Sequence, residues 1–431
     1  MSCGCETTSS VTLPIRAERS LDQKIANIRA NPSGAKDFIL ADAKDADMAS
    51  GLAATGTDPV TGKRRSLSDY RDQMREIVKQ GLVDIMIMSA STSDALTIKE
   101  RLFENSRVTP AVRANDTTDI HLPAGGTYGA EPSRPFRSAT IEQIQSGKVN
   151  PTPAERTLGA DLGLYSITPN NNLDFDYPTL EAYREFRNEA EQKGFRHFLE
   201  VFDPNACGDS CPVDLGRYIN DLIVRTLAGV PSNGRPLFLK IAYHGPKAME
   251  ELVAYDPSLI PGVLGGSSGT TYDAFKLLED VKKYGGRAAL FGRKINNSEH
   301  QLTFVRFLRA IADEQISAGE AVKSYHGELE KLKIKPARSL KEDMEATITA
   351  SSYAGTSGGG TVAASAKPQA AKKEEAAKSV HGKTVRTTLV AYPKRTDGEI
   401  DFKKMTPAQK VAYSRDRIRS DINSANGNGR A

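Results

Sequence analysis

Short apolar runs alternate with amphipathic segments between about residue 36 and residue 315 of this 431-residue chain. The apolar runs have the length of buried strands, and the segments between them carry apolar residues at helical spacing. Strands are predicted at 37–42, 82–88, 111–115, 162–168, 197–202, 236–243, 261–265 and 288–292. Helices are predicted at 67–80, 92–103 (opened by Ser91 and Thr92), 138–145, 179–193, 215–228, 272–283 and 299–314.

This order of elements predicts an α/β fold, a (β/α)8 TIM barrel over residues 36–320. Successive strands with helices between them favour a parallel sheet, because each parallel pair needs a crossover connection. Eight such units match a closed barrel. An open doubly wound sheet is the alternative, but Asp42–Asp47 lacks the Gly-x-Gly-x-x-Gly turn that usually follows the first strand of that fold.

The pattern also divides the rest of the chain. Residues 1–35 form an N-terminal extension, with an amphipathic helix over 20–30 that could cover the bottom of the barrel. Residues 321–349 are predicted to be helical, with a break near Pro336. Residues 350–379 are almost entirely Ala, Gly, Ser, Thr and Lys, which is typical of a flexible linker.

The last segment, residues 380–431, is a basic tail. It contains a strand-like run at 385–392 and a helix with Thr406 as N-cap and Pro407 at the first position. Between His381 and Ala431, eleven Lys and Arg residues face five Asp and Glu residues. A solvated basic helix is one interpretation. A peptide that docks on a protein partner is the other, because a linker raises the effective concentration of a tethered segment.

Composition narrows the class of protein. Apolar residues make up 39% and charged residues 26% of the chain, as in soluble globular proteins. No run approaches the length of a transmembrane helix, and the N-terminus lacks the pattern of a secretory signal. We therefore expect a cytoplasmic protein with no membrane partner. A net charge of +4 over this length gives no reason to expect nucleic acid binding.

The cysteines form two close pairs, Cys3 with Cys5 and Cys207 with Cys211. Four cysteines are too few for a disulfide framework in a chain of this length. A four-thiolate metal site and a redox pair are alternatives, but thiols with no role are the interpretation that we favour. No metal and no cofactor are expected.

A charged residue interrupts the sixth apolar run. Lys240 lies within Pro236–Tyr243, which otherwise reads as a buried strand. An ammonium group is costly to bury, and a lysine held neutral by burial can attack a carbonyl group and form a Schiff base. A lysine that reaches from an edge strand to water is the alternative.

Two glycine-rich loops favour the catalytic interpretation of Lys240. They follow the seventh and eighth strands, where barrels of this kind commonly bind phosphate. Glycines let backbone N–H groups approach an oxyanion, and an arginine can bind it with two hydrogen bonds. The candidate phosphate-binding residues are Gly265, Gly266, Ser267, Gly292 and Arg293.

These motifs resemble a known family. The runs Leu239–Pro246, Val263–Ser267 and Ala289–Ile295, with Ile39–Ala43 in the first strand, are similar to the archaeal-type (DhnA-type) class I fructose-bisphosphate aldolases. The resemblance covers about residues 36–315. It implies that Lys240 forms the Schiff base, that Asp42 is the active-site aspartate of the first strand, and that the two glycine loops bind phosphate.

The chain departs from the family at the proton-transferring tyrosine expected at the end of the fifth strand. Phe202 occupies that place, and a phenyl ring cannot carry a proton. Asp203, Tyr165 and Tyr243 are candidates to replace it, although both tyrosines have an ordinary packing interpretation. The first strand also has Ala43 where the family has histidine.

The predicted function is that of a class I aldolase-like lyase. Its substrate would be a phosphorylated sugar or keto compound, with fructose-1,6-bisphosphate as one candidate. The resemblance also implies a homo-oligomer. The rival hypothesis is a barrel with impaired catalysis that serves as a scaffold or ligand-binding subunit, docked through its tail. A metal-dependent class II aldolase is disfavoured, because no His/Glu ligand set is visible at the strand ends.

Overall fold

The computed structural model describes residues 18–58, 61–116, 123–127, 130–266 and 269–347, and in the tail residues 393, 400, 404–406 and 409. The chain divides into two compact units, residues 1–363 and residues 364–431. The first unit holds all the strands and helices discussed below.

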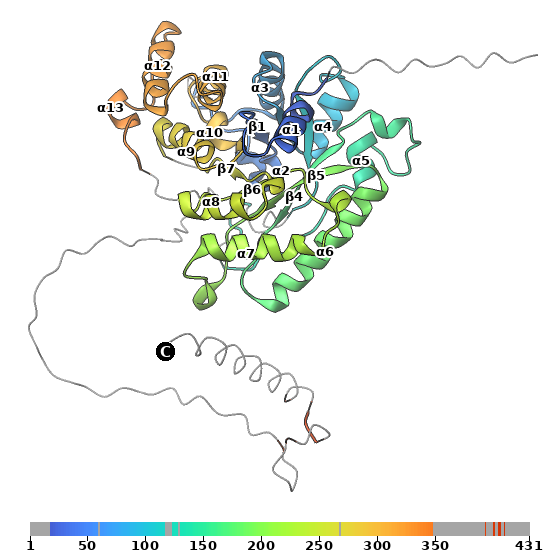
Figure 1. The fold of residues 1–431 in the computed structure, drawn as a ribbon. Coiled ribbons are helices and arrows are strands. Elements are labelled where there is room, and N and C mark those ends of the chain that lie inside the picture. Colours follow the sequence, from blue (N-terminus) through green and yellow to red (C-terminus); the bar gives the residue numbers. More distant parts are fainter. Residues whose placement is uncertain are drawn as a thin grey trace, which may run out of the picture. The chain divides into compact units, whose positions relative to one another are not determined.

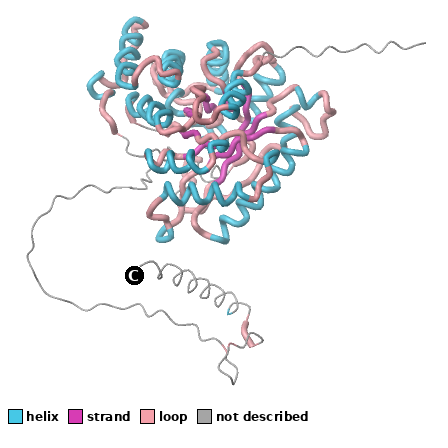
Figure 2. The backbone as a smooth tube through the Cα atoms, viewed as in Figure 1, coloured by secondary structure: helices cyan, strands magenta, loops and turns pink. Residues whose placement is uncertain are grey.

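Eight parallel strands form a closed barrel, with helices around it (Figures 1 and 2). The strands pair in sequence order, and the last one pairs with the first, so the sheet has no free edge. The predicted (β/α)8 barrel is confirmed, and the open sheet is excluded. The strands are β1 (Ile39–Lys44), β2 (Ile85–Met88), β3 (Thr109–Arg113), β4 (Leu162–Ile167), β5 (Arg196–Val201), β6 (Leu239–Ile241), β7 (Gly262–Leu264) and β8 (Ala288–Phe291).

The helices that alternate with the strands follow the amphipathic segments. Two of them have the predicted bounds, α3 (Leu67–Gln80) and α7 (Leu215–Ala228). Local signals explain the limits of α3: Ser66 and Asp69 form a reciprocal capping box, and Gly81 ends the helix with a φ of 70°. The other helices that match predicted segments are α5 (Ile141–Ser146), α9 (Thr271–Lys283) and α11 (Gln301–Ala312).

Some predicted helices differ in extent. The segment expected at 92–103 begins earlier, as α4 (Ala90–Ser93), and continues as a π-helical turn over Asp94–Lys99. Its cap is Ser89 rather than Ser91 or Thr92, because the Ser89 hydroxyl accepts the backbone N–H of Thr92. The helix expected at 179–193 is α6 (Leu173–Gln192), which begins six residues earlier at the Asn172 cap and contains Pro178.

Several short or medium helices were not predicted. They are α2 (Asp47–Ser50), α8 (Pro246–Tyr255) and α10 (Arg293–Asn296). Both α2 and α10 are a single turn long, which is too short to give a periodic pattern. α8 opens with a proline at its first position after Gly245, a recognisable start signal.

The N-terminal helix closes one end of the barrel. α1 (Ser20–Ala30) has the predicted bounds and buries Leu21, Ile25 and Ile28. These side chains share one apolar cluster with inward-facing residues such as Ile39 and Ile85, which lie in the first half of their strands. The expectation that this helix covers the barrel bottom is confirmed.

Two helices follow the barrel. α12 (Ala318–Lys331) packs in the same cluster as α9 and α11 through Val322 and Tyr325, and α13 (Leu340–Asp343) is a single turn. The predicted break near Pro336 lies between them. None of the helices within the described ranges is long and apolar enough to cross a membrane.

Few tail residues are described. Thr406 and Gln409 exchange reciprocal hydrogen bonds, as expected for a helix that starts at Thr406. The strand-like run 385–392, Pro407 and the pair Cys3 and Cys5 lie outside the described residues.

Candidate active site

Lys240 lies inside the barrel at its C-terminal end. Side chains alternate between the two faces of a strand, and Phe238, two positions earlier, packs in the interior cluster. Leu239 and Ile241 pack in the layer between strands and helices instead. Lys240 is 6% exposed and lines an interior cavity. The prediction of a buried lysine within the sixth strand is therefore confirmed.

A carboxylate on the neighbouring strand pairs with this lysine. Lys240 and Glu200 are register partners on β6 and β5, and Lys240 Nζ lies 2.6 Å from Glu200 Oε1. The second oxygen of Glu200 accepts a hydrogen bond from Ser166 Oγ at 2.7 Å. Glu200 is 1% exposed, so the ion pair is shielded from water.

A second ion pair adjoins the first. Arg113 Nε donates to Asp45 Oδ2 at 2.6 Å, and Arg113 Nη2 lies 3.6 Å from Glu200 Oε2. Arg113 Nη1 also donates to Ser166 Oγ at 3.3 Å. Burial raises the pKa of Asp45, but the charges of Arg113 and Lys240 outweigh it, so the pKa lies below its usual value. Asp45 is therefore held as a carboxylate.

Asn115 fixes the strand that carries Ser166. The backbone N–H of Ser166 donates to Asn115 Oδ1 at 2.7 Å, and Asn115 Nδ2 donates to the Ser166 carbonyl at 2.8 Å. Lys240, Arg113, Glu200 and Asp45 thus form a cluster of two positive and two negative side chains, contributed by β6, β3, β5 and the residue after β1. Buried charges are tolerated in such a cluster because each has a partner and hydrogen bonds.

The two glycine loops line the same cavity as Lys240. This cavity has a volume of about 70 Å³. Its walls also include Asp45, Glu200, Arg113 and apolar side chains of β7, β8 and the segment after β1. The lining residues among those predicted are Lys240, Gly265, Gly266, Gly292 and Arg293. Ser267 lies outside the described residues.

Close packing explains two of these glycines. A Cβ at Gly292 would lie 2.6 Å from the carbonyl oxygen of Ala43, and a Cβ at Gly265 would overlap the ring of Phe291. Neither the Ala43 carbonyl group nor the buried Phe291 ring can shift easily to make room for a Cβ atom, because the interior is closely packed. The loops therefore approach the neighbouring strands only because no side chain intervenes.

Asp42 does not line the cavity. Ala43, one residue later, faces it, so Asp42 points to the opposite side of β1. There it lies 3.8 Å from Lys44, and both side chains are fully buried. Lys44 donates to Asn296 Oδ1 and Gln301 Oε1, while neither Asp42 oxygen accepts a hydrogen bond from the described part of the chain. Asp45 is the aspartate of this segment that reaches Lys240.

The proposed substitutes for the missing tyrosine also lie away from the cavity. Tyr165 faces the helix layer, where it stacks on Phe186, and burial raises its pKa. Asp203 Oδ1 lies 2.9 Å from His244 Nε2, and neither residue lines the cavity. Tyr243 packs on the cluster between strands and helices. The packing interpretation of both tyrosines fits this placement.

Phe202 lies one step beyond Glu200 on the inward face. It is buried in a small apolar cluster with Ala242 and Leu264. Leu264 also lines the cavity, so this cluster adjoins the charged residues. The position where the resemblance implies a tyrosine is thus occupied by apolar packing.

Glu200, Arg113, Asp45 and Ser166 belong to the site but are not among the residues predicted from the sequence. Glu200 gives the same signal as Lys240, because it is a charge within an apolar strand. Arg113 does so in the third strand. The alternation of side chains on β1 would have favoured Asp45 over Asp42, because Ile39, Ala41 and Ala43 share the inward face.

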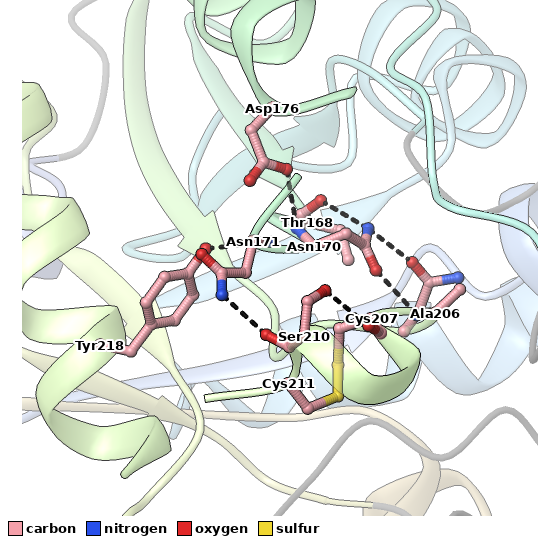
Figure 3. The surroundings of a disulfide bond; sticks show 10 residues. Thr168, Asn170, Asn171, Asp176, Ala206, Cys207, Ser210, Cys211 and Tyr218 are labelled. Carbon is pink, nitrogen blue, oxygen red and sulfur yellow. Dashed lines mark hydrogen bonds between the residues drawn. A yellow bond between two sulfur atoms is a disulfide. The ribbon is translucent and has the colours of Figure 1, made fainter. Parts of the chain in front are cut away.

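Cys207 and Cys211 form a disulfide in the loop between β5 and α7, which corrects the expectation of thiols with no role (Figure 3). Neighbouring hydrogen bonds join this loop to the loop after β4: Asn171 Nδ2 donates to the Ser210 carbonyl at 2.7 Å, and the Ala206 N–H donates to Asn170 Oδ1 at 2.7 Å. The pairing is possible because a single 3-10 turn, Gly208–Ser210, brings the two cysteines together.

Larger hollows, of about 260, 470 and 600 Å³, lie elsewhere on the described part of the chain, and Lys240 lines none of them. One of about 260 Å³ lies beside α1 and includes Arg196, Asp22 and Asp161. Arg196 is paired with both carboxylates there, so these charges satisfy one another at the surface. We therefore take the smaller interior cavity as the candidate site.

Several solved aldolase structures are similar to this chain. A fructose-bisphosphate aldolase from Slackia heliotrinireducens is similar with a TM-score of 0.52 at 15% identity, over 71% of this chain and 91% of that chain. An archaeal fructose 1,6-bisphosphate aldolase gives a TM-score of 0.49 at 15% identity, over 68% and 99% of the two chains. A Schiff-base-forming fructose-1,6-bisphosphate aldolase gives 0.48 at 17% identity, over 68% and 100%.

No protein-family profile and no curated protein matches this chain. At this level of identity, the likeness to the first of these aldolases shows a shared barrel fold.

The buried pair on the outer side of β1 gives a stability prediction. Burial raises the pKa of Asp42 to about 6 and lowers the pKa of Lys44 to about 8, and the attraction between the two opposes both shifts. Lys44→Met should destabilise the fold by about 3–5 kcal/mol at pH 7, where both groups are charged in the wild type, because it leaves the Asp42 carboxylate buried without a countercharge. The loss should be smaller at pH 5, where Asp42 takes up a proton.

Denaturant unfolding at the two pH values measures this effect. The control is the double variant Asp42→Asn with Lys44→Met, which should recover most of the lost stability because no charge remains. A single variant as stable as the wild type at pH 7 would show that the pair is not energetically coupled.

Proposed function

We propose that this chain is a class I, Schiff-base-forming, aldolase-like lyase that acts on a phosphorylated sugar or keto compound. The observation that carries the proposal is one cavity lined by Lys240, by its partner Glu200, and by the glycine loops after β7 and β8. Fructose-1,6-bisphosphate is the first substrate to test, because solved aldolases with this barrel act on it.

Glu200 would prepare Lys240 for attack. Transfer of one proton from the ammonium group to the carboxylate over 2.6 Å gives a neutral amine and a carboxylic acid. The amine attacks the substrate carbonyl carbon to give a carbinolamine. The acid then returns the proton to the departing hydroxyl, so that water leaves and a protonated Schiff base remains.

The protonated Schiff base would act as an electron sink. Removal of a proton from the hydroxyl two carbons away breaks the carbon–carbon bond, releases an aldehyde and leaves an enamine on Lys240. Protonation of the enamine carbon and addition of water then release the second product. Glu200 is the carboxylate nearest to Lys240, and we assign these proton transfers to it in place of Phe202.

The glycine loops would hold the substrate phosphate. Gly266 after β7, and Gly292 and Arg293 after β8, line the cavity, whereas the N–H of Gly265 already donates to the Leu290 carbonyl at 2.9 Å. An arginine beside backbone N–H groups suits a phosphate dianion. Binding of the phosphate there would place the carbonyl group near Lys240, which lines the same cavity.

Schiff-base formation is directly testable. Borohydride reduction in the presence of dihydroxyacetone phosphate should add one reduced ligand to the chain, because borohydride traps the imine. Intact mass and peptide mapping should place the adduct on Lys240. Lys44, which is also buried but does not line the cavity, is the internal control and should remain unmodified. A chain without an adduct, or with one elsewhere, contradicts the proposal.

The role of Glu200 predicts a separate kinetic effect. Glu200→Gln should lower the turnover of fructose-1,6-bisphosphate by about 10²–10⁴-fold, the usual loss on removal of a general acid or base. Steady-state kinetics measures it. Glu185→Gln, which removes the same charge from an exposed position on α6, should behave as wild type. Full activity of Glu200→Gln would mean that another group carries the proton.

A second candidate is a scaffold or ligand-binding subunit that no longer turns over substrate. The apolar packing of Phe202 with Ala242 and Leu264 favours it, because that cluster offers no proton carrier. In this case the basic tail would dock on a protein partner. Under either hypothesis we propose a homo-oligomer, as the family resemblance implies.

Deletion of residues 351–431 separates the two candidates. An aldolase should keep the borohydride adduct on Lys240 and its turnover, because every residue assigned to the site precedes the deletion. A docking subunit should instead lose a partner in a pull-down from cell extract. Loss of turnover by a truncated chain that remains folded, judged by circular dichroism, would contradict the assignment of catalysis to the barrel alone.

A further inference from the structure

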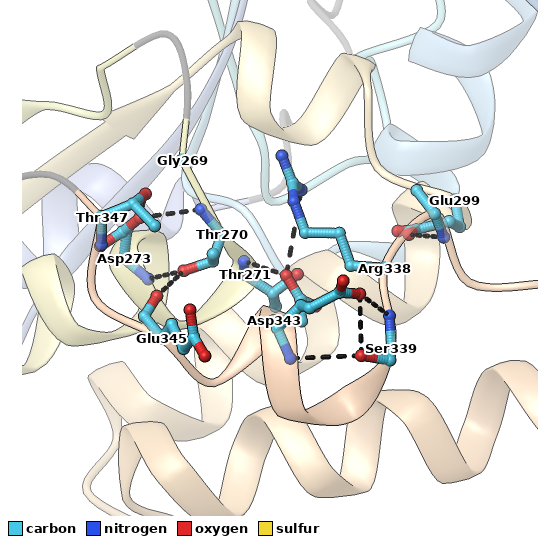
Figure 4. A network of polar contacts seen from close by, with 12 residues as sticks. Gly269, Thr270, Thr271, Asp273, Glu299, Arg338, Ser339, Asp343, Glu345 and Thr347 are labelled. Carbon is cyan, nitrogen blue, oxygen red and sulfur yellow. Dashed lines mark hydrogen bonds and ion pairs between the residues drawn. The ribbon is translucent and has the colours of Figure 1, made fainter.

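A segment that follows the barrel is bonded to the loop after β7. Ser339–Thr347, which we call the C-terminal clamp, lies against the start of α9 (Figure 4). The Thr270 hydroxyl donates to the Glu345 carbonyl at 2.7 Å, and the Thr271 N–H donates to Asp343 Oδ1 at 2.7 Å. Thr347 donates to Asp273 through its backbone N–H at 2.9 Å.

Asp343 is the centre of these contacts. It is 3% exposed, and its second oxygen lies 3.0 Å from His326 Nε2 of α12. Arg338 Nη1 lies 4.0 Å from its first oxygen. Burial raises the pKa of Asp343, but hydrogen bonds from Thr271 and His326 lower it more, so the group is held as a carboxylate. A carboxylate at the N-terminus of α9 is also favoured by the helix dipole.

The same loop is held from its other side. Lys294, the residue after the candidate phosphate ligand Arg293, donates to the Gly269 carbonyl at 2.6 Å. Residues 269–271 are therefore fixed between α10 and the clamp. This stretch begins three residues after Gly266, whose φ of 65° is a conformation that glycine adopts readily.

The occupied end of α9 has a consequence for ligand binding. Helix N-termini are common phosphate sites, but here the Thr271 N–H already donates to Asp343. A phosphate in the cavity would instead be bound by the glycine backbone and Arg293, which line it. Of those groups, Arg293 is the one joined to residues 269–271 by described contacts, because its chain neighbour Lys294 donates to the Gly269 carbonyl.

We propose that the C-terminal clamp, through Asp343, is a positioning element that sets the position of Arg293 for phosphate, by way of residues 269–271 and Lys294. The inference rests on the proposed function, because it concerns the phosphate end of the same site. Asp343 touches neither the cavity nor Lys240. Its effect is on substrate affinity, while the bond-breaking steps at Lys240 proceed unchanged.

The test compares Asp343→Asn with Glu345→Gln in the full-length chain. The two variants remove one negative charge from the same segment, but Glu345 is exposed and contributes its backbone carbonyl to the clamp. Asp343→Asn should weaken inorganic phosphate binding in calorimetry and raise the KM for fructose-1,6-bisphosphate, each by about tenfold, with kcat within about twofold. Glu345→Gln should match the wild type.

Hydrogen exchange provides a readout that does not need activity. The amides of residues 269–273 should lose protection in Asp343→Asn and keep it in Glu345→Gln. If Asp343→Asn does not fold, Thr347→Val carries the test, because it removes one exposed side-chain donor to Asp273 and should shift phosphate affinity in the same direction.

The outcomes distinguish the two proposals. A wild-type chain that binds phosphate, together with an Asp343→Asn variant that binds it equally well, overturns the clamp alone. An equal fall in kcat and in kcat/KM also overturns it, because the effect would then lie in the chemical steps. A wild-type chain that binds no phosphate and forms no adduct on Lys240 overturns the proposed function and the clamp together.

Discussion

The arrangement of charged side chains inside the C-terminal end of the barrel depends on one ion pair between adjacent strands, that of Lys240 with Glu200. The two residues are register partners, so the pairing of β5 with β6 itself brings their charged groups within 2.6 Å. Each charge would be costly to bury alone, and loss of one partner from such a pair typically costs about 3–5 kcal/mol. Ser166 donates a hydrogen bond to Glu200, and Arg113 adds a second positive charge 3.6 Å from it. The pair thus couples the stability of the barrel to the chemistry that we propose for it.

Much of the fold could be predicted because the strand pattern is continuous. Eight apolar runs separated by amphipathic segments leave few arrangements other than a closed parallel barrel. The residues of the site are harder to predict from sequence than the fold, because neighbouring residues of a strand point to opposite faces. A choice that is wrong by one position therefore places the side chain on the wrong face. Asp42 was chosen from motif similarity, whereas alternation along β1 places Asp45 inward. Lys240 was identified because a charge stood out in an apolar run, and the same reasoning applies to Glu200.

Contacts between distant parts of the chain could not be predicted in this way. Asp343 bonds Thr271 across 72 positions, and nothing in the periodicity of either segment indicates the other as its partner. The disulfide of Cys207 with Cys211 is different, because the spacing was visible but compatible with several kinds of chemistry. A 3-10 turn between the two cysteines brings them together, and this local geometry could not be predicted from their spacing. The spacing of apolar residues therefore predicts the helices and strands. Which distant residues bond to one another depends on how those helices and strands pack in three dimensions.

The helix α1 closes the N-terminal end of the barrel interior. Because its Leu21, Ile25 and Ile28 pack among the inward-facing side chains there, Lys240 is open to a ligand from the C-terminal end of the barrel. Under the proposed function, the fragment bonded to Lys240 stays behind until water frees it, so the free aldehyde would leave first. The covalent bond sets that order, and the closed bottom means that the departing aldehyde and the incoming water would use the same end of the barrel.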